Sequence, residues 1–305
     1  MFAPPPEIPT RVFARLPDDF RRDGQATEWA KVQMHGAKLH SFLEGPSFDR
    51  AGHLYVVDIP YGRIFRISSD GAFTLVAEYD GEPNGLKIHR DGRIYIADHK
   101  RGIMALDPAD GVVAPVIDRP RLQRFKGTND LFFAANGDLY FTDQGQTGLQ
   151  DPTGRVYRAR AEGRLDCLLE GVPSPNGLVT NSDETILYLA VTRANAVWRV
   201  PLLADGTTTK VGVFIQLSGG LAGPDGMALD EAGNLAVCHA GLGTVWLFSP
   251  HGEPLARIRS CAGALTTNLA YGGPDRRTLY ITESDSGSIL AADMAVPGRA
   301  MYGES

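Results

Sequence analysis

The sequence predicts an all-β protein, a six-bladed β-propeller preceded by a short N-terminal arm. Two observations carry this prediction: one pattern occurs six times, and convincing helical periodicity is almost absent after residue 40. In each repeat, a turn containing Gly or Asp leads into a short apolar strand, which a polar step and another strand follow. Successive repeats are 40 to 48 residues apart, within reach of a four-stranded blade. The equivalent strand positions are Leu54, Ile94, Leu139, Leu187, Leu235 and Leu279.

The alternative to a propeller is a β-sandwich whose hairpins resemble each other by chance. Sandwiches do not repeat one motif six times at this period, and radial repetition leaves only short, protected strand edges. We therefore divide the chain into an arm of residues 1–40 and a propeller of residues 41–305.

The arm differs from the repeats in composition. It contains Pro4 to Pro6, a mixed-charge stretch from Pro17 to Arg22, and a candidate short helix near Ala26 to Lys31. We expect it to pack on the propeller and to supply the strand that closes the ring. A regulatory or dimerising role remains an alternative.

Bulk composition excludes several classes of function. The 305 residues are 43% hydrophobic and 22% charged, which is ordinary for a soluble globular protein. The apolar runs are far shorter than the roughly 20 residues that span a bilayer. The net charge of -6 and the lack of a Lys/Arg block with interleaved aromatics argue against nucleic-acid binding. A small-molecule partner is the expectation, and the oligomeric state stays open.

The N-terminus and the cysteines predict a cytoplasmic protein. The start, MFAPPPEIP, has neither a basic n-region nor an apolar core, so we expect no signal peptide. The cysteines are Cys167, Cys238 and Cys261, an odd count without a CxxC motif. Free thiols in a reducing compartment are the expectation, with one disulfide as the alternative.

The main functional signal is a carboxylate or carboxamide at one phase of every repeat, ten or eleven residues before the reference position. If this phase begins each innermost strand, six side-chain oxygens converge at one mouth of the central channel. Asn and Asp also dominate ordinary turns, which is the plain alternative. Two carboxylates with several amide oxygens suit Ca²⁺ or Mg²⁺, with Mn²⁺ as a further option. The six residues are Glu44, Asn84, Asn129, Asn176, Asp225 and Asn268.

A second set of polar residues lies four positions after each reference residue. These side chains either hold the inner ligands by hydrogen bonds or simply end strands before turns. His239 belongs to this set, and His99 directly follows another member. We interpret both histidines as polar lining or structural residues rather than catalytic bases. The set is Asp58, Asp98, Asp143, Val191, His239 and Glu283.

These motifs resemble the family of senescence marker protein 30, gluconolactonases and luciferin-regenerating enzyme. The resemblance runs from about Phe42 to Ile289 and rests on FLEGPSFD, KGTNDLFFAANGDLYFTD, SPNGLVTNSDETILYLA and AGPDGMALDEAGNLAV, in order and at blade spacing. It implies a six-bladed propeller that binds one divalent cation through Glu44, Asn176 and Asp225, with Asn129 beside the substrate.

The chain departs from that family at one position. Sugar lactonases of the family often carry an Arg two residues before the residue that matches Asn129. Here the position is Gly127, with Lys126 beside it. The sequence therefore leaves open whether the lactone bears sugar hydroxyls or is another organic lactone.

Together these observations predict a divalent-metal-dependent lactonase. Ca²⁺ is the expected cofactor, with Mg²⁺, Mn²⁺ or Zn²⁺ as alternatives. A bound cation would polarise the ring carbonyl, and Asp225 would bind the metal and accept a proton from the attacking water. We expect the substrate oxygens to contact Lys126, Asn84, Asn129, Asn268 and His239.

Other reaction classes have less support in the sequence. A GxSxG elbow, a dinucleotide fingerprint and a P-loop are all missing. The alternatives are a non-catalytic metal-binding protein, a scaffold, or another activity on this fold, such as phosphotriester hydrolysis or a strictosidine-synthase-like condensation. A pair of carboxylates in the channel favours catalysis over scaffolding.

Overall fold

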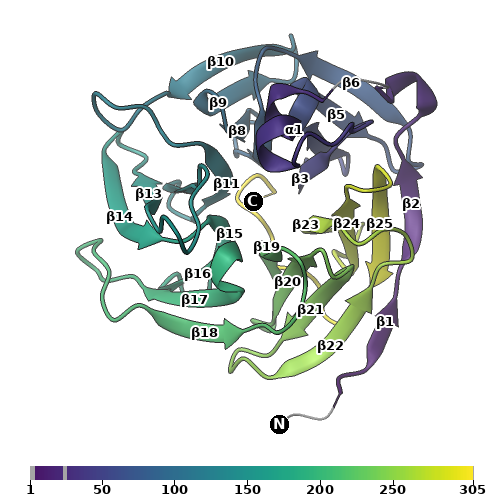
Figure 1. Cartoon of the computed structure of the whole chain (residues 1–305). Coiled ribbons are helices and arrows are strands. Elements are labelled where there is room, and N and C mark those ends of the chain that lie inside the picture. The colour runs from purple at the N-terminus through teal and green to yellow at the C-terminus, as the bar shows by residue number, and fades with distance from the viewer. Residues whose placement is uncertain (1–3, 23–25, 305) are drawn as a thin grey trace.

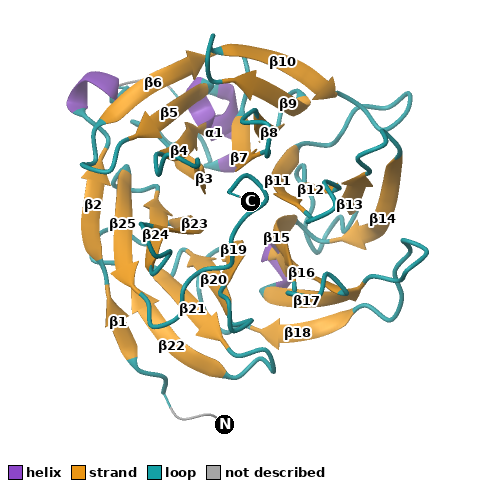
Figure 2. Ribbon diagram, turned by 180° about the vertical axis from the view of Figure 1, so that it is seen from behind, coloured by secondary structure: helices purple, strands orange, loops and turns teal. Residues whose placement is uncertain are grey.

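The computed structural model describes residues 4–22 and 26–304, which fold into six sheets arranged in a ring (Figure 1). Seen from behind, the same ring surrounds a central axis at which the C-terminus lies (Figure 2). The predicted six-bladed β-propeller is therefore confirmed. Among the described residues, no helix has the length and apolar character needed to cross a bilayer.

Each blade is built outward from the axis by antiparallel pairing. The innermost strands are β3 (Leu43–Phe48), β7 (Pro83–Ile88), β11 (Thr128–Phe133), β15 (Pro175–Thr180), β19 (Gly223–Leu229) and β23 (Thr266–Gly272). The second strands are β4 (Leu54–Asp58), β8 (Ile94–Asp98), β12 (Leu139–Asp143), β16 (Ile186–Val191), β20 (Leu235–Ala240) and β24 (Thr278–Glu283).

The outer strands complete the blades. The third strands are β5 (Arg63–Ile67), β9 (Gly102–Asp107), β13 (Gly154–Ala159), β17 (Ala196–Pro201), β21 (Thr244–Phe248) and β25 (Ser288–Asp293). The outermost strands are β6 (Phe73–Glu78), β10 (Val112–Ile117), β14 (Leu165–Val172), β18 (Gly212–Gln216) and β22 (Pro254–Arg259), and an arm strand takes this place in the last blade.

Burial decreases from the axis outward. Strands β11 and β15 are buried at every residue, whereas β10 is mostly exposed. A strand covered on both faces has no reason to alternate polar and apolar residues. This explains the short, continuous apolar runs by which the repeat was recognised.

The N-terminal arm adds two strands to the sheets of the ring. Strand β2 (Arg11–Arg15) pairs with β25 as the outermost strand of the last blade, so the predicted closing strand is confirmed. Strand β1 (Glu7–Pro9) runs parallel to β22. Helix α1 (Glu28–Gln33) begins two residues later than expected, because the Thr27 hydroxyl accepts a hydrogen bond from the Ala30 N–H and caps it. Residues 1–3 and 23–25 of the arm lie outside the described residues.

Short 3₁₀ turns and the C-terminal tail complete the chain. The turns are η1 (Asp18–Phe20), η2 (Ile59–Tyr61) and η3 (Thr192–Ala194). The tail crosses the channel at the ends of the innermost strands. The Arg299 N–H donates to the Leu229 carbonyl at 3.0 Å, and the ring of Tyr302 stacks on Phe133 with centroids 5.4 Å apart. The tail therefore covers one end of the channel and leaves the other end to α1.

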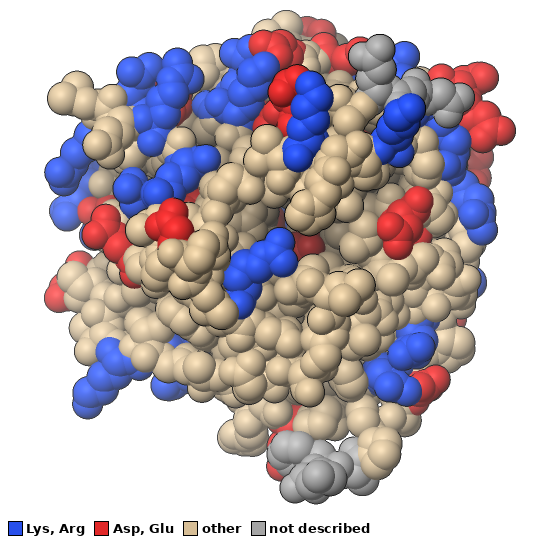
Figure 3. Space-filling view, in the orientation of Figure 1, with Lys and Arg blue, Asp and Glu red and all other residues tan. Residues whose placement is uncertain are grey.

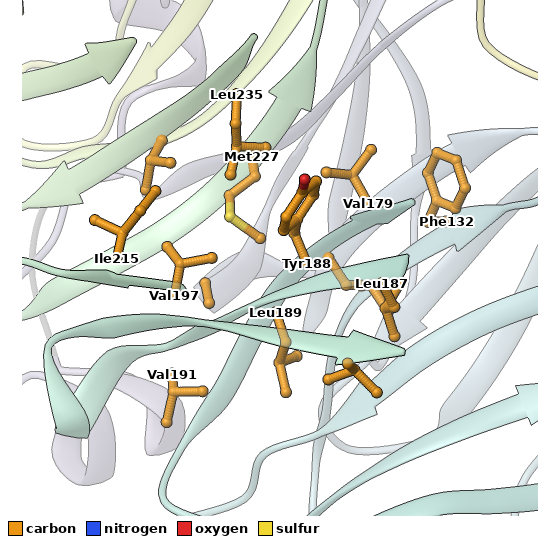
Figure 4. Packing of buried hydrophobic residues seen from close by; sticks show 14 of the residues in the cluster. Phe132, Val179, Leu187, Tyr188, Leu189, Val191, Val197, Ile215, Met227 and Leu235 are labelled. Carbon is orange, nitrogen blue, oxygen red and sulfur yellow. The ribbon is translucent and has the colours of Figure 1, made fainter. Parts of the chain in front are cut away.

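The apolar core lies between neighbouring blades rather than on the axis. One cluster joins the third, fourth and fifth blades through Phe132, Leu189 and Met227, and Figure 4 shows buried side chains of this cluster between the strands. Because packing is satisfied between the sheets, the axis is free for polar residues. The cysteines form no disulfide among the described residues, which agrees with the predicted free thiols.

Candidate functional site

The polar residues that recur in the repeats lie at the start of the innermost strands, beside one cavity of about 490 Å³. Every innermost strand is irregularly paired with its neighbour at this point, as a β-bulge would make it. Bulges re-aim side chains and are common beside active sites. The predicted convergence at one mouth is confirmed for five residues: Glu44, Asn84, Asn129, Asn176 and Asp225.

Asn268 is the exception, because the sixth member of the ring is Thr267. Thr267 lies four residues before Tyr271, the residue that pairs with Leu279. Glu44 stands in the same relation to Phe48, which pairs with Leu54. The β23–β24 hairpin has one residue pair, Gly272 with Thr278, beyond the pair of Tyr271 and Leu279. Counting back eleven residues from Leu279 therefore stopped one residue short of Thr267.

Asn268 instead belongs to a second layer, one residue deeper along the axis. Four of the six positions in this layer are glycines, and the other two are Asp130 and Asn268. A Cβ on Gly226 would lie 2.0 Å from Asn268 Oδ1, and one on Gly85 would lie 2.5 Å from Asp130 Oδ1. Gly226 and Gly85 therefore make room for these two polar side chains beneath the ring, whereas a Cβ on the other two glycines would meet the backbone of a neighbouring strand. The four glycines are Gly45, Gly85, Gly177 and Gly226.

Three carboxylates meet in these two layers, and we call Glu44, Asp130 and Asp225 the cavity carboxylates. Burial and the charge of Asp130 raise the pKa of Glu44 to about 8. Burial, then the charges of Glu44 and Asp130, raise the pKa of Asp225 well above its ordinary value. Burial also raises the pKa of Asp130, against the opposing charge of Lys87.

Few hydrogen bonds offset this repulsion. Asn268 Nδ2 donates to Glu44 Oε2 at 2.9 Å and to Asp130 Oδ2 at 3.3 Å. The Gly45 N–H also donates to Glu44. Asn176 donates its side-chain hydrogen bond to Asp225. The site thus concentrates negative charge in a buried place, which is costly unless a cation neutralises it.

The donor set fits a hard divalent cation. Besides the carboxylates of Glu44 and Asp225, it offers amide oxygens. Asn176 uses its amide nitrogen toward Asp225, and Asn129 Nδ2 donates to Gln144 Oε1 at 2.9 Å, so both keep Oδ1 for a ligand. Among the described residues, no three His, Cys, Asp or Glu side chains form a metal-binding group. The shell would therefore mix carboxylates with amides, as oxygen-binding cations accept.

The second repeated set has a structural role within the blades. We call Asp58, Asp98, Asp143 and Glu283 the strand-end acids. Each ends a second strand and accepts a hydrogen bond from the backbone N–H just before the innermost strand of its own blade. Of the two predicted alternatives, strand-end stabilisation is the one observed. The donors are Phe42 at 2.7 Å, Glu82 at 3.1 Å, Gly127 at 2.9 Å and Leu265 at 3.2 Å.

Besides Asn268, two predicted substrate contacts lie away from the cavity lining. His239 is fully buried and accepts a hydrogen bond on Nδ1 from the Trp246 indole at 3.2 Å, and burial lowers its pKa. Lys126 Nζ donates to the Thr153 hydroxyl at 2.8 Å. Neither side chain lines the cavity, so their roles in substrate binding stay predictions.

Gly127 has a local reason to lack a side chain. Its φ is +146°, and a Cβ there would lie 2.3 Å from the ring of His99. His99 in turn lies 3.4 Å from Gln33 of helix α1, measured between their Nε2 atoms. His99 therefore fills the space beside Gly127 and connects this blade to the arm.

Several residues of the site were missed by reasoning from the sequence. Asp130 had a usable signal, since four repeats carry Gly at its position. Arg193 follows a strand without any repeated pattern, and it is the single Lys or Arg among the described residues that line the cavity. Figure 3 shows this face, where a basic side chain lies beside a hollow with an acidic side chain at its bottom. The arm residues Trp29 and Gln33 also line the cavity, and the repeats gave no hint of them.

Comparison with known proteins gives matches in sequence and in structure. A model of the SMP-30/Gluconolactonase/LRE-like region matches residues 42–285. A gluconolactonase of Zymomonas mobilis is 33% identical over 272 residues, covering 79% of this chain and 76% of that protein. The lactonase drp35 of Staphylococcus aureus is 30% identical over 244 residues, covering 76% and 73%. A calcium-binding protein, regucalcin, from Agrobacterium tumefaciens shares the fold with a TM-score of 0.78 at 24% identity, over 97% of this chain and 98% of that one.

Proposed function

The chain belongs to the SMP-30/gluconolactonase/LRE-like family, and we propose that it hydrolyses a small organic lactone with the help of one divalent cation, most favourably Ca²⁺. The observation that carries the proposal is the meeting of Glu44 and Asp225 with amide side chains in one cavity on the propeller axis. The relatives named gluconolactonase and lactonase support the reaction class.

Glu44, Asn176 and Asp225 would hold the cation, with Asn129 as a further oxygen donor. When bound, a divalent cation supplies positive charge that polarises an ester carbonyl and stabilises the oxyanion formed on it. Mg²⁺ and Mn²⁺ also accept oxygen ligands, but Mg²⁺ demands a stricter octahedral geometry than Ca²⁺. Zn²⁺ is the weakest candidate, because its usual ligands are Cys and His.

Asp225 is the proposed proton acceptor for the attacking water. Water adds through its oxygen to the lactone carbonyl carbon, and its proton passes to the Asp225 carboxylate. The ring C–O bond then breaks, and the departing ring oxygen takes that proton to become a hydroxyl. The product is a hydroxy acid whose carboxyl ionises and releases one proton to solution. A general base in such a position contributes about 10²–10⁴ to the rate.

The remaining ring residues would orient the substrate. Asn84 and Asn129 offer amide groups at the level of the carboxylates, and Arg193 provides a positive charge at the rim that would attract the carboxylate of the product. The hydrogen bond from Asn129 to Gln144 fixes the orientation of the amide.

The test is hydrolysis of a panel of lactones by protein stripped with a chelator and then given Ca²⁺, Mg²⁺, Mn²⁺ or Zn²⁺. The panel contains glucono-, xylono- and galactono-lactones, γ-butyrolactone and dihydrocoumarin, and a pH indicator follows acid release. We expect activity to return with Ca²⁺ and to be lost in Asp225→Asn but not in the exposed control Asp293→Asn. Folded, metal-bound protein without turnover would favour a non-catalytic binding role. Turnover that is equal before and after chelation would exclude the metal.

A further inference from the structure

The cavity has one wall of apolar side chains, which the N-terminal arm largely provides. Trp29 and Met34 of the arm line it together with Phe42 and Leu265. The rings of Trp29 and Phe42 pack with centroids 4.9 Å apart. This wall lies beside the cavity carboxylates, and Gln33 and His35 are the polar residues that the arm adds to the lining.

Two large apolar side chains also remain exposed where the cavity opens. Val32 of helix α1 is 58% exposed, and Leu149 of the loop between β12 and β13 is 71% exposed. Both line the cavity. Exposed apolar residues that flank a concave site mark a surface that a ligand or partner covers.

Much of the polar lining already uses its hydrogen-bonding groups within the protein. Gln144 accepts from Asn129 and donates to the Ser174 hydroxyl at 2.9 Å. The hydroxyls of Thr147 and Thr192 donate to backbone carbonyls at 2.6 Å and 2.8 Å. Gln146 and Gln150 lie in the exposed part of the lining. Besides Asn84 and the exposed Arg193, the cavity therefore has few free donors for the hydroxyl groups of a sugar.

From these observations we propose that the substrate is a lactone carrying an apolar alkyl chain. The inference rests on the proposed lactonase function. The ester group lies at the cavity carboxylates, and the substituent lies against the arm wall, between Val32 and Leu149. Since burying one methylene contributes about 0.8 kcal/mol, each added methylene should raise kcat/KM about threefold to fourfold until the wall is covered.

The experiment measures kcat/KM with Ca²⁺ present for γ-butyrolactone, γ-hexalactone, γ-octalactone and γ-decalactone, and for glucono-δ-lactone. We expect a rise along the series and a preference for γ-octalactone over the gluconolactone of at least tenfold. The double variant Val32→Ser/Leu149→Ser should flatten the rise. The matched control Val112→Ser/Leu122→Ser, in which both residues are also exposed but lie outside the cavity, should keep it.

Three results would contradict the inference in distinguishable ways. A flat series with gluconolactone preferred would overturn the substrate class and leave the lactonase function standing. A rise that survives Val32→Ser/Leu149→Ser would overturn the role of the arm wall and its rim. No hydrolysis of any of the five lactones by folded protein would overturn the proposed function and the inference with it.

Discussion

The molecule has two sets of buried acids, and the fold compensates their charges to different extents. The strand-end acids receive backbone N–H groups within their own blades, and Asp58 also pairs with the buried guanidinium of Arg63. The cavity carboxylates lie closer to the axis and receive few donors. Burial raises the pKa in both sets, of Asp58 and Asp143 as well as of Glu44 and Asp225. Neighbouring carboxylates raise the pKa of Glu44 and Asp225 further, whereas the charge of Arg63 lowers that of Asp58. Burial is common to both sets. What separates them is whether the fold itself supplies the compensating charge.

This difference distinguishes acids that stabilise the fold from acids that await a ligand. An ionised carboxylate that accepts backbone hydrogen bonds contributes to stability. A group of carboxylates without enough partners costs stability, and such perturbed groups gather at functional sites. Removing a charge from each set should therefore have opposite consequences.

The largest effect is expected for Asp225→Asn. Loss of the proposed base and metal ligand should lower kcat/KM by about 10²–10⁴. The thermal midpoint of the metal-free protein should stay equal or rise, because one repelling charge disappears. Steady-state kinetics and calorimetry on the same preparation measure both. Full activity with bound metal would remove Asp225 from the mechanism.

Asp58→Ala should show the reverse pattern. It leaves Arg63, which is 1% exposed, without its carboxylate, so the free energy of unfolding should fall by about 3–5 kcal/mol. Folded protein should retain most of its kcat/KM. Denaturant unfolding measures the loss, and the double variant Asp58→Leu/Arg63→Met should recover part of it. A stable but inactive Asp58→Ala protein would contradict the division between the two sets.

The pH dependence of metal-free protein sharpens the comparison. Glu44 has a pKa of about 8 in the fold against an ordinary value of 4.5, so the folded state holds more protons between these values. The free energy of unfolding should then fall as the pH rises from about 4.5 to about 8. We expect the thermal midpoint to decline by several degrees across this range.

Two variants isolate the contribution of Glu44 to that decline. Glu44→Gln should weaken it, and the exposed control Glu253→Gln should not. Saturating Ca²⁺ should oppose it as well, because a bound cation favours the ionised carboxylate. An equal slope in Glu44→Gln and in the control would show that other groups dominate.

The smallest effect is expected for Asn268→Ala, which removes hydrogen bonds to two cavity carboxylates. Mutation of a residue that hydrogen-bonds to a metal ligand typically lowers the metal affinity by about 10–100-fold. We expect weaker Ca²⁺ binding by titration calorimetry, with KM for the lactone unchanged at saturating metal. A higher KM with unchanged Ca²⁺ affinity would instead restore Asn268 as a substrate contact, as the sequence predicted.

The sequence predicted most of the fold and five of the six ring positions, because a repeat makes equivalent residues visible. It missed Thr267 because the β23–β24 hairpin is extended by the pair of Gly272 and Thr278, which shifted the count by one residue. It could not separate the two sets of acids, since that depends on which backbone N–H groups face Asp58 or Glu44 in three dimensions. The sequence did not predict the apolar wall, because Trp29 and Val32 belong to the arm and lie outside the repeats.

The strand pair that closes the ring has a consequence for how the protein folds. Strand β2 pairs with β25, so Arg11 meets Ala291, nearly a whole chain length away. Contacts between such distant segments form slowly, and until they form, β25 presents an unpaired edge open to association with other chains. We expect the nascent ring to be vulnerable until its last blade is complete. Once the ring is closed, it has no terminal blade from which unfolding could start.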